Sequence, residues 1–451
     1  MTLPAELADY LQKHPETRFV DAVLYDLCGT AIGKRIPVRD AAKFWSSGVA
    51  FCAGITTLDA LGACWDVNGI GFSDGDPDAT SYPLPGTLVP VPWAAAPTAQ
   101  VQIAPAPPED APHWWFDPRA ILSAIVSRFA DLKLKPVVAC ELEFYLVDPT
   151  RDASGRVTPA RPRQSGRAPE APRVLAFDKL DEWAEVLAEI DAACQAQGVP
   201  AGAATAEYGG AQFEVNLAHV DDPVLACDHA LMLRRIVKGV ANRHGLDATF
   251  MSKPFGDQSG SGLHIHASLV DDAGRNVFDE TRPDGDRLLG HAIAGLQATT
   301  YDAMAFFAPN INAYRRFAPN QFVPVNTSWG INNRSVSFRV PMGGGKARRI
   351  EHRIAGADAN PYLVMAAMLA GFHHGLANRL DPTPPSTGNA GEEADPEMPL
   401  RLWTALDRLE GSTLMADHFG PRYPAAYAAI KRSEFEAFMA DVLPREHDWY
   451  L

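Results

Sequence analysis

Two short segments of the sequence carry pairs of metal-ligating side chains at the spacing of a β-strand. Alternate residues of a strand point to the same face of a sheet. Glu141 and Glu143 are therefore expected to face one point, and His264 and His266 are expected to do the same. Carboxylate and imidazole groups bind divalent cations, so these pairs indicate metal chemistry. For the two glutamates taken alone, the alternative is a buried, salt-bridged structural pair.

Two further segments add acids and arginines. Glu207 and Glu214 flank a pair of adjacent glycines, which allows a bulge or bend that returns both acids to one face. Arg349, Glu351 and Arg353 alternate as strand neighbours on one face do, and a cross-strand ladder of salt bridges is the alternative. Divalent cations beside arginines suit an anion that both can hold, such as a phosphate.

Other arginines strengthen this interpretation, namely Arg334, Arg339 and Arg348. No phosphate-binding loop of the P-loop type accompanies them, because the glycines before Lys346 lack its leading spacing and its following Ser or Thr. That glycine run is interpreted as a flexible loop. The residues alone thus predict nucleotide-triphosphate chemistry at a two-metal, arginine-lined site on an antiparallel sheet.

The composition limits the class of protein. The chain has 451 residues, 47% of them hydrophobic and 21% charged, which is typical of a globular protein with a large core. A net charge of −15 argues against nucleic-acid and anionic-membrane partners. Six cysteines without paired spacing indicate free thiols of a reducing compartment, and the N-terminus lacks the pattern of a signal peptide, so a cytoplasmic location is expected.

Hydrophobic periodicity places these segments on elements. Strands are predicted at Phe19–Tyr25, Gly33–Pro37, Val49–Phe51, Pro136–Val147, Gly262–Val270 and Ser335–Val340. Helices are predicted at Pro118–Leu132, Asp181–Gln197, Pro223–His244 and over most of 355–450, interrupted by a loop at Asp381–Pro399. Residues 90–112 are interpreted as a crossover without an element of its own, and Arg151–Arg173 as a solvated loop.

The ordered set of motifs resembles the glutamine synthetase family over nearly the whole chain. They are Glu141-Leu-Glu-Phe-Tyr-Leu, Gly210-Ala-Gln-Phe-Glu-Val, Lys253-Pro-Phe-Gly-Asp, Ser261-Gly-Leu-His-Ile-His, Asn333-Arg-Ser-Val-Ser-Phe-Arg-Val-Pro341, Lys346-Ala-Arg-Arg-Ile-Glu-His-Arg353 and Ala359-Asn-Pro-Tyr362. The resemblance implies an α+β fold, with an N-terminal β-grasp domain at 1–108 and a catalytic domain with a curved antiparallel sheet at 109–451. It also implies a homododecamer of two stacked hexameric rings.

The resemblance further implies roles for residues at matching positions. One divalent cation (Mg or Mn) is expected at Glu143, Glu207 and Glu214, and a second at Glu141, His264 and Glu351. ATP and its phosphates are expected at His266, Ser268, Arg334, Arg339, Lys346, Arg349 and Glu207. The substrate glutamate and the transferred phosphate are expected at Arg316 and Arg353, with Glu143, Ser259, Gly260 and His264 beside them. Arg316, Arg334 and Arg353 are the expected catalytic residues.

Departures from the family pattern concern the ammonia side of the site. Phe322 stands where the family has the glutamate of its ammonium site, and Phe51-Cys-Ala-Gly-Ile55 lacks the family's aspartate. A small cation needs close carboxylates to replace its water, so apolar side chains at both positions favour an organic amine. Ser259 also replaces a usual asparagine near the α-groups of the substrate.

The expected activity is therefore the ATP-dependent joining of the γ-carboxylate of glutamate to a primary organic amine through a γ-glutamyl phosphate. A polyamine would need distant acids, with Asp74, Asp76 and Asp78 as candidates, and their alternative is an acidic surface turn. An apolar amine would instead prefer aromatic neighbours, with Phe322, Trp329 and Phe51 as candidates, although these rings also suit packing. A true glutamine synthetase and a non-catalytic ring protein that binds nucleotide or glutamate are the competing hypotheses.

Overall fold

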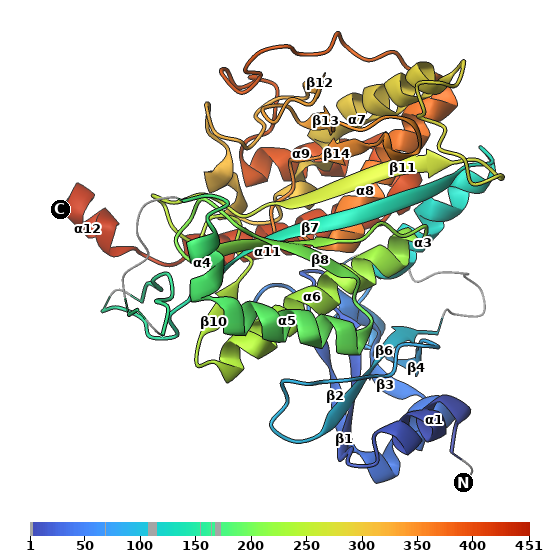
Figure 1. The fold of residues 1–451 in the computed structure, drawn as a ribbon, viewed down its shortest axis with the longest axis vertical. Helices are drawn as coiled ribbons and strands as arrows, with labels where there is room; N and C mark the ends of the chain where they lie inside the picture. The colour runs from blue at the N-terminus through green and yellow to red at the C-terminus, as the bar shows by residue number, and fades with distance from the viewer. Residues whose placement is uncertain (1–2, 68, 107–114, 154, 164, 167–172) are drawn as a thin grey trace.

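Two sheets of unequal size form the framework of the chain in the computed structural model (Figure 1). The structure describes residues 3–67, 69–106, 115–153, 155–163, 165–166 and 173–451. The mixture of antiparallel sheet and separate helices is the α+β fold that the sequence predicts. The predicted domain boundary between residues 108 and 109 lies outside the described residues. Among those described, no helix combines the length and apolar composition that spanning a bilayer requires.

The smaller sheet contains six strands. They are β1 (Phe19–Tyr25), β2 (Ala31–Pro37), β3 (Val49–Cys52), β4 (Asp78–Pro83), β5 (Val89–Pro90) and β6 (Thr98–Pro105). The main path runs β2-β1-β6-β4-β3, and β1 and β6 are parallel. The prediction of no element in 90–112 is wrong, because β6 lies at the centre of this sheet. Its buried Gln100 and Gln102 bond to side chains of a distant helix, and these polar positions conceal the strand in the sequence.

The larger sheet contains eight strands and carries the predicted site. They are β7 (Lys135–Val147), β8 (Ala201–Ala206), β9 (Gln212–Leu217), β10 (Asp247–Thr249), β11 (Leu263–Val270), β12 (Trp329–Ile331), β13 (Phe338–Val340) and β14 (Ile350–His352). The order is β12-β13-β14-β11-β7-β9-β8, with β10 beside β7. All neighbours are antiparallel except β12 and β13. The strands predicted at 136–147 and 262–270 are confirmed.

Helices pack on both sheets and contribute to the hydrophobic core of each. They are α1 (Ala5–Lys13), α2 (Ala42–Ser46), α3 (Pro118–Ser127), α4 (Phe177–Glu182), α5 (Ala184–Gln197), α6 (Pro223–Arg243), α7 (Gly285–Phe307), α8 (Pro361–Asn378), α9 (Leu402–Gly411), α10 (Thr413–Phe419), α11 (Tyr423–Met439) and α12 (Pro444–Tyr450). In Figure 1, α5 and α6 lie between the two sheets, and α12 projects from the body at the left. Alternate residues of β7, including Leu142 and Phe144, are fully buried in the main core.

Local sequence signals explain several boundaries. Asp222 caps α6 by accepting hydrogen bonds from the backbone N–H of Val224 (3.0 Å) and Leu225 (3.2 Å). Pro223 occupies the first turn, where the missing N–H costs nothing. The helix predicted at 181–197 is interrupted at Trp183, so that α4 and α5 are separate.

Two predicted loops have different outcomes. The loop at 381–399 is confirmed, since no helix or strand lies within it. The prediction of a solvated loop at 151–173 is only partly right for its described residues. Ala160 is fully buried in the main core, and Arg163 donates a hydrogen bond to the carbonyl of His244. Sequence analysis did not identify α7, which packs along α8.

Candidate active site

The register of the larger sheet places the predicted ligands opposite one another. His264 on β11 pairs with Glu141 on β7, and His266 pairs with Glu351 on β14. Arg339 on β13 is in turn opposite Glu351. The intervening residues of β7 face the hydrophobic core, so these side chains share the other face of the sheet.

Glu141 lies at the centre of the group. Its Oε1 is 2.8 Å from His266 Nε2, and its Oε2 is 3.5 Å from His264 Nδ1. Arg349 Nε donates to His266 Nδ1 at 3.0 Å, which places the imidazole proton on Nε2, facing Glu141. Burial opposes ionisation of Glu141, but the hydrogen bonds from both histidines hold its pKa far below the usual range.

Glu351 is almost completely buried, with 1% of its surface exposed. Its two oxygens form ion pairs with Arg339 Nη1 (2.7 Å) and with Arg353 Nη1. Burial raises the pKa of Glu351, yet the charge of Arg353, followed by His264 and His266, lowers it to about 2. The carboxylate is therefore negative and able to act as a metal ligand.

The acids of β9 and of the segment before it face the same group. Glu214 pairs with Glu143 across β7 and β9. Burial, and then the charges of Glu141, Glu143, Glu207 and Glu351, raise the pKa of Glu214 to about 9. Burial and Glu143 raise the pKa of Glu207 to about 7. Buried acids whose charges repel one another fit a site that divalent cations would neutralise.

Two sets of three ligands stand close enough together for a metal ion within the described residues. Their donor atoms lie within 4.8 Å of one another in the sets Glu141, His266, Glu351 and Glu141, Glu214, His264. The members of these two sets differ from those of the two predicted sets. Glu143 and Glu207 belong to neither set, and His266, which the sequence assigned to the nucleotide, joins one. The assignment of ligands to individual cations stays a prediction.

Three arginines beside the acids each have an N–H donor without a hydrogen-bond partner among the described residues. Arg316, Arg339 and Arg353 each carry a buried Nε–H that has no hydrogen-bond partner among the described residues. Arg316 and Arg353 are each 5% exposed. Arg316 Nη1 donates to the carbonyl of Ile354 at 3.0 Å, which fixes its direction. Buried, unpartnered guanidinium donors fit an anion such as a carboxylate or a phosphate.

A glycine-rich segment before β11 allows Arg316 to approach the histidines. A Cβ atom on Gly260 would lie 2.8 Å from Arg316 Cγ and 2.7 Å from the carbonyl of Ser252. A Cβ on Gly262 would lie 2.9 Å from His264 Nε2. Only glycine leaves room at both positions.

Gln212 is a site residue that sequence analysis missed. Its side-chain Nε2 donates to the carbonyl of Gly260 (3.0 Å) and approaches Glu143 Oε2 (3.4 Å). Its Oε1 accepts from the backbone N–H of Gly209 at 2.8 Å. Gln212 thus connects the glycine segment to the acids. The only signal in the sequence is its position two residues before Glu214, on the same face of β9.

The remaining predicted residues lie at the edges of the group. Ser268 is buried on β11, on the face of His264 and His266, and the carbonyl of Ser259 accepts from the Tyr145 hydroxyl at 2.7 Å. Arg334 and Lys346 are exposed. The structure does not bring these two into contact with the buried acids, so their contacts with a nucleotide stay predictions.

An aromatic pair stands next to the acids. The rings of Phe322 and Tyr208 stack with centroids 6.2 Å apart and planes 29° apart, and they are 59% and 42% exposed. Tyr208 directly follows Glu207, so the pair adjoins the carboxylates. Phe51 is engaged elsewhere, because Lys34 Nζ lies 4.7 Å from its ring centroid. Trp329 donates its indole N–H to the carbonyl of Thr383 at 2.6 Å.

This fold and this face of acids, histidines and arginines match one protein class. A family model described as the catalytic domain of glutamine synthetase matches residues 116–450. The chain belongs to the glutamine synthetase family.

Its relatives include proteins that act on organic amines. The chain is 39% identical over 449 residues to gamma-glutamylputrescine synthetase PuuA of Escherichia coli K12, covering 99% of this chain and 94% of that protein. It is 31% identical over 422 residues to glutamate–isopropylamine ligase of a Pseudomonas species, covering 90% and 88%. The solved structure of a GmaS/ADP complex superimposes with a TM-score of 0.83 at 27% identity, covering 98% of this chain and 99% of that one.

Proposed function

We propose that this chain is an ATP-dependent ligase that joins the γ-carboxylate of glutamate to a primary organic amine. The proposal follows the named activities of its relatives, putrescine and isopropylamine ligation among them. It identifies the face formed by β7, β9, β11, β13 and β14 as the place of reaction. The true glutamine synthetase and the non-catalytic ring protein are the hypotheses against which it is tested.

The observation that carries the choice of amine is the stacked pair of Phe322 and Tyr208. Two half-exposed rings beside Glu207 offer apolar surface and π-faces to an alkylammonium group. They offer no carboxylate to an ammonium ion, which has no carbon to bury.

The chain's own residues are proposed to act as follows. Arg316 and Arg353, with their free N–H donors, bind the substrate carboxylate and the phosphoryl group that activates it. Arg339, together with Arg334 and Lys346, contacts the nucleotide phosphates. The acids and histidines of the two ligand sets hold divalent cations, which when bound supply charge stabilisation to phosphoryl transfer.

The deciding experiment measures phosphate release from ATP with saturating glutamate and a panel of amines. The panel contains ammonia, ethylamine, isopropylamine, ethanolamine and putrescine. We expect release to depend on an organic amine and to be much slower with ammonia at equal concentration. Faster release with ammonia than with any organic amine would identify a glutamine synthetase. No release with any amine, from enzyme that binds ATP and Mn²⁺, would favour the non-catalytic protein.

The variant Phe322→Glu tests the aromatic pair directly. It is expected to lower kcat/KM for the best organic amine about five- to thirtyfold, because one lost stacked contact with a cation costs about 1–2 kcal/mol. Use of ammonia is expected to rise. The matched control is Leu225→Glu, at an exposed apolar residue of α6, a helix that packs on the other face of the sheet from the acids. Unchanged amine preference in Phe322→Glu would contradict the role of the pair.

The oligomeric state and the location of the protein complete the proposal. We propose assembly into a dodecamer of two hexameric rings, which mass measurement of the native protein would test. We also propose a cytoplasmic location, in keeping with six free cysteines.

A further inference from the structure

A cavity lies between the smaller, N-terminal sheet and α6, away from the acids. Its volume is about 480 Å³, which is within the range of small-molecule sites. It is bounded by the turn between β1 and β2, by the residues that follow β10, and by α6. Because α6 packs in the main core with Leu142 and Phe144 of β7, it stands on the side of the sheet opposite Glu141 and Glu143. None of the predicted active-site residues lines this cavity.

Arg234 provides a buried cation in the wall of this cavity. It is 6% exposed, and its Nη2 donates to the carbonyls of Ala357 (2.6 Å) and Ala359 (2.5 Å). Its Nε–H is buried and has no partner among the described residues. Gly29 lies against the guanidinium, and a Cβ there would lie 3.1 Å from Arg234 Nη1. A buried guanidinium with unused donors is costly unless an anion accepts from them.

The other charges that line the cavity leave an excess of positive charge. Arg235 is already engaged, because it donates to Gln100 (2.7 Å) and to Asp21 (2.8 Å), a carboxylate that it shares with Arg35. The ammonium group of Lys238, one turn after Arg234, forms no ion pair or hydrogen bond with any of the described residues. Asp358 is the only carboxylate in the described lining.

Asp358 is already engaged in hydrogen bonds. It accepts from the hydroxyl of Ser252 (2.6 Å) and from the side-chain amide of Asn310 (3.0 Å). Its single negative charge therefore faces two cations, Arg234 and Lys238, that no other acid in the lining neutralises. The cavity consequently favours an anion.

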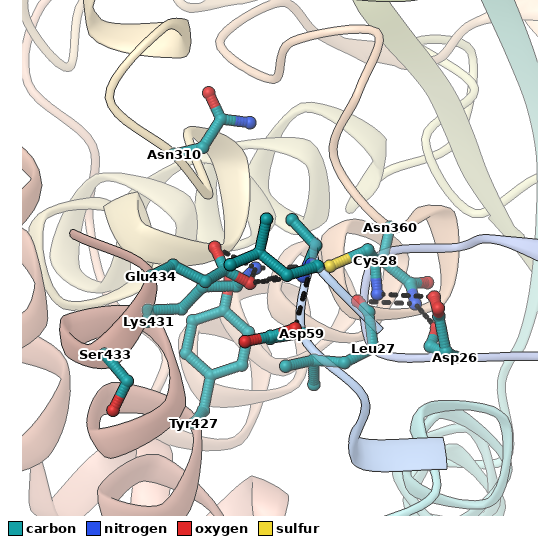
Figure 2. Close-up of polar contacts among 12 residues, drawn as sticks. Asp26, Leu27, Cys28, Asp59, Asn310, Asn360, Tyr427, Lys431, Ser433 and Glu434 are labelled. Carbon is teal, nitrogen blue, oxygen red and sulfur yellow. Dashed lines mark hydrogen bonds and ion pairs between the residues drawn. The ribbon is translucent and has the colours of Figure 1, made fainter. Parts of the chain in front are cut away.

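Part of the remaining wall is aromatic, and the turn on one side is held in place. Tyr25, Trp93 and Phe250 line the cavity and offer aromatic surface. Figure 2 shows how the turn that forms one wall is fixed to the catalytic domain: Asn360 donates to the carbonyl of Asp26 (3.0 Å) and that of Leu27 (3.1 Å).

Cys28, also in the wall, is fixed from its other side. Its Sγ accepts from Lys431 Nζ at 3.4 Å, and Glu434 pairs with the same lysine at 2.8 Å (Figure 2). Lys431 is 2% exposed and fully used by these two partners, so it is no part of the charge offered to a ligand. A cavity with fixed walls loses little entropy when a ligand binds.

We propose that this cavity is a binding site for a small organic anion, with its carboxylate or phosphate on Arg234 and Lys238 and its flat apolar body against the aromatic walls. This site is independent of the proposed ligase activity. It joins the turn of the N-terminal sheet to α6, so an occupant would contact both parts of the chain.

The probes are 4-bromobenzoate, its neutral isostere 4-bromobenzamide, and 4-bromophenyl phosphate. Each is soaked into crystals of the full chain, where anomalous scattering locates the bromine, and each is titrated by calorimetry with the active site saturated by ADP and Mn²⁺. We expect at least one of the two anions to occupy the cavity, and the neutral isostere to bind at least about tenfold more weakly. The tighter anion identifies the preferred head group.

Variants of the exposed Lys238 distinguish a specific anion-binding site from a general electrostatic attraction of anions to the protein. Lys238→Glu is expected to weaken the bound anion at least about tenfold, whereas Lys238→Arg retains binding. Lys13→Glu, an exposed lysine of α1, makes the same change of net charge elsewhere and is expected to leave the affinity unchanged. The proposal is overturned if no bromine lies in the cavity, if the amide binds as well as the anions, or if Lys238→Glu matches Lys13→Glu.

Discussion

Single residues of the candidate active site show two ways of holding buried charge. Glu351 is neutralised by Arg339 and Arg353, so its charge is stable without a metal ion. Glu214 has no ion-pair partner among the described residues, and burial together with the charges of nearby acids raises its pKa to about 9. The two acids are separated by two intervening strands of one sheet, β11 and β7. The same face of the sheet therefore contains one carboxylate whose charge is already balanced by arginines. It also contains a group of acids that bound cations would neutralise.

Replacement of Glu351 is expected to destabilise the fold and to remove a metal ligand. Glu351→Gln leaves two buried guanidinium groups without a negative partner, which costs about 3–5 kcal/mol. We expect a drop of several degrees in Tm, measured with EDTA present, and loss of one bound Mn²⁺ per chain, measured by calorimetry. The control Glu397→Gln removes an exposed partner of Arg408, a pair worth less than about 1 kcal/mol. Equal effects of the two variants would contradict the buried role of Glu351.

Secondary structure elements differ in how far the sequence reveals them. β7 and β11 were predicted because long apolar strands alternate with a period of two, and the site pairs Glu141/Glu143 and His264/His266 follow directly from that period. β6 was missed because Gln100 and Gln102 are buried but polar. His266 contacts Glu141 because of the register between β11 and β7. Periodicity within one strand carries no information about that register. The same period places Gln212 on the face of Glu214, but it does not predict the hydrogen bond from Gln212 to the carbonyl of Gly260.

The turn between β1 and β2 gives a prediction about pH. Asp26 is 3% exposed, and its Oδ1 accepts from the backbone N–H of Cys28 (2.9 Å) and Thr30 (2.8 Å). Burial raises its pKa from 3.8 to about 6, despite these hydrogen bonds. The folded chain therefore binds this proton more tightly than the unfolded chain, and stability falls as pH rises from about 4 to about 6.

Asp26→Asn keeps the acceptor oxygen and removes the charge. We expect its Tm to exceed that of the native protein by a few degrees at pH 8, reflecting at most about 3 kcal/mol. Near pH 3.5 the difference is expected to disappear, because Asp26 is then mostly neutral in both states. Asp441→Asn, at an exposed carboxylate, is the control. A lower Tm for Asp26→Asn at pH 8 would show that the charged form stabilises the turn.

At the scale of the whole molecule, Asp228 connects the two sheets through the helices between them. It lies on α6 and is 3% exposed. Its carboxylate accepts from Gln102 of β6 (3.0 Å), from Arg119 of α3 (2.9 Å) and from the hydroxyl of Tyr362 on α8. One buried acid thus joins the central strand of the smaller sheet to three helices of the larger part. Nothing in the sequence near Asp228 indicates this role, since its partners lie over 100 residues away.

Asp228→Asn therefore tests whether the smaller sheet depends on this junction. The amide places N–H groups against donors from the half-buried Arg119 and leaves that guanidinium without its carboxylate partner, which destabilises the junction. We expect amide hydrogen exchange in β1 and β6 to accelerate more than exchange in β7, because β7 keeps its pairing with β9 and β11. Asp221→Asn, at an exposed carboxylate paired with Lys135, is the matched control and should change neither rate. Equal acceleration of exchange in β6 and β7 would contradict this expectation. It would mean that the junction stabilises the whole chain as one cooperative unit, and does not specifically attach the smaller sheet.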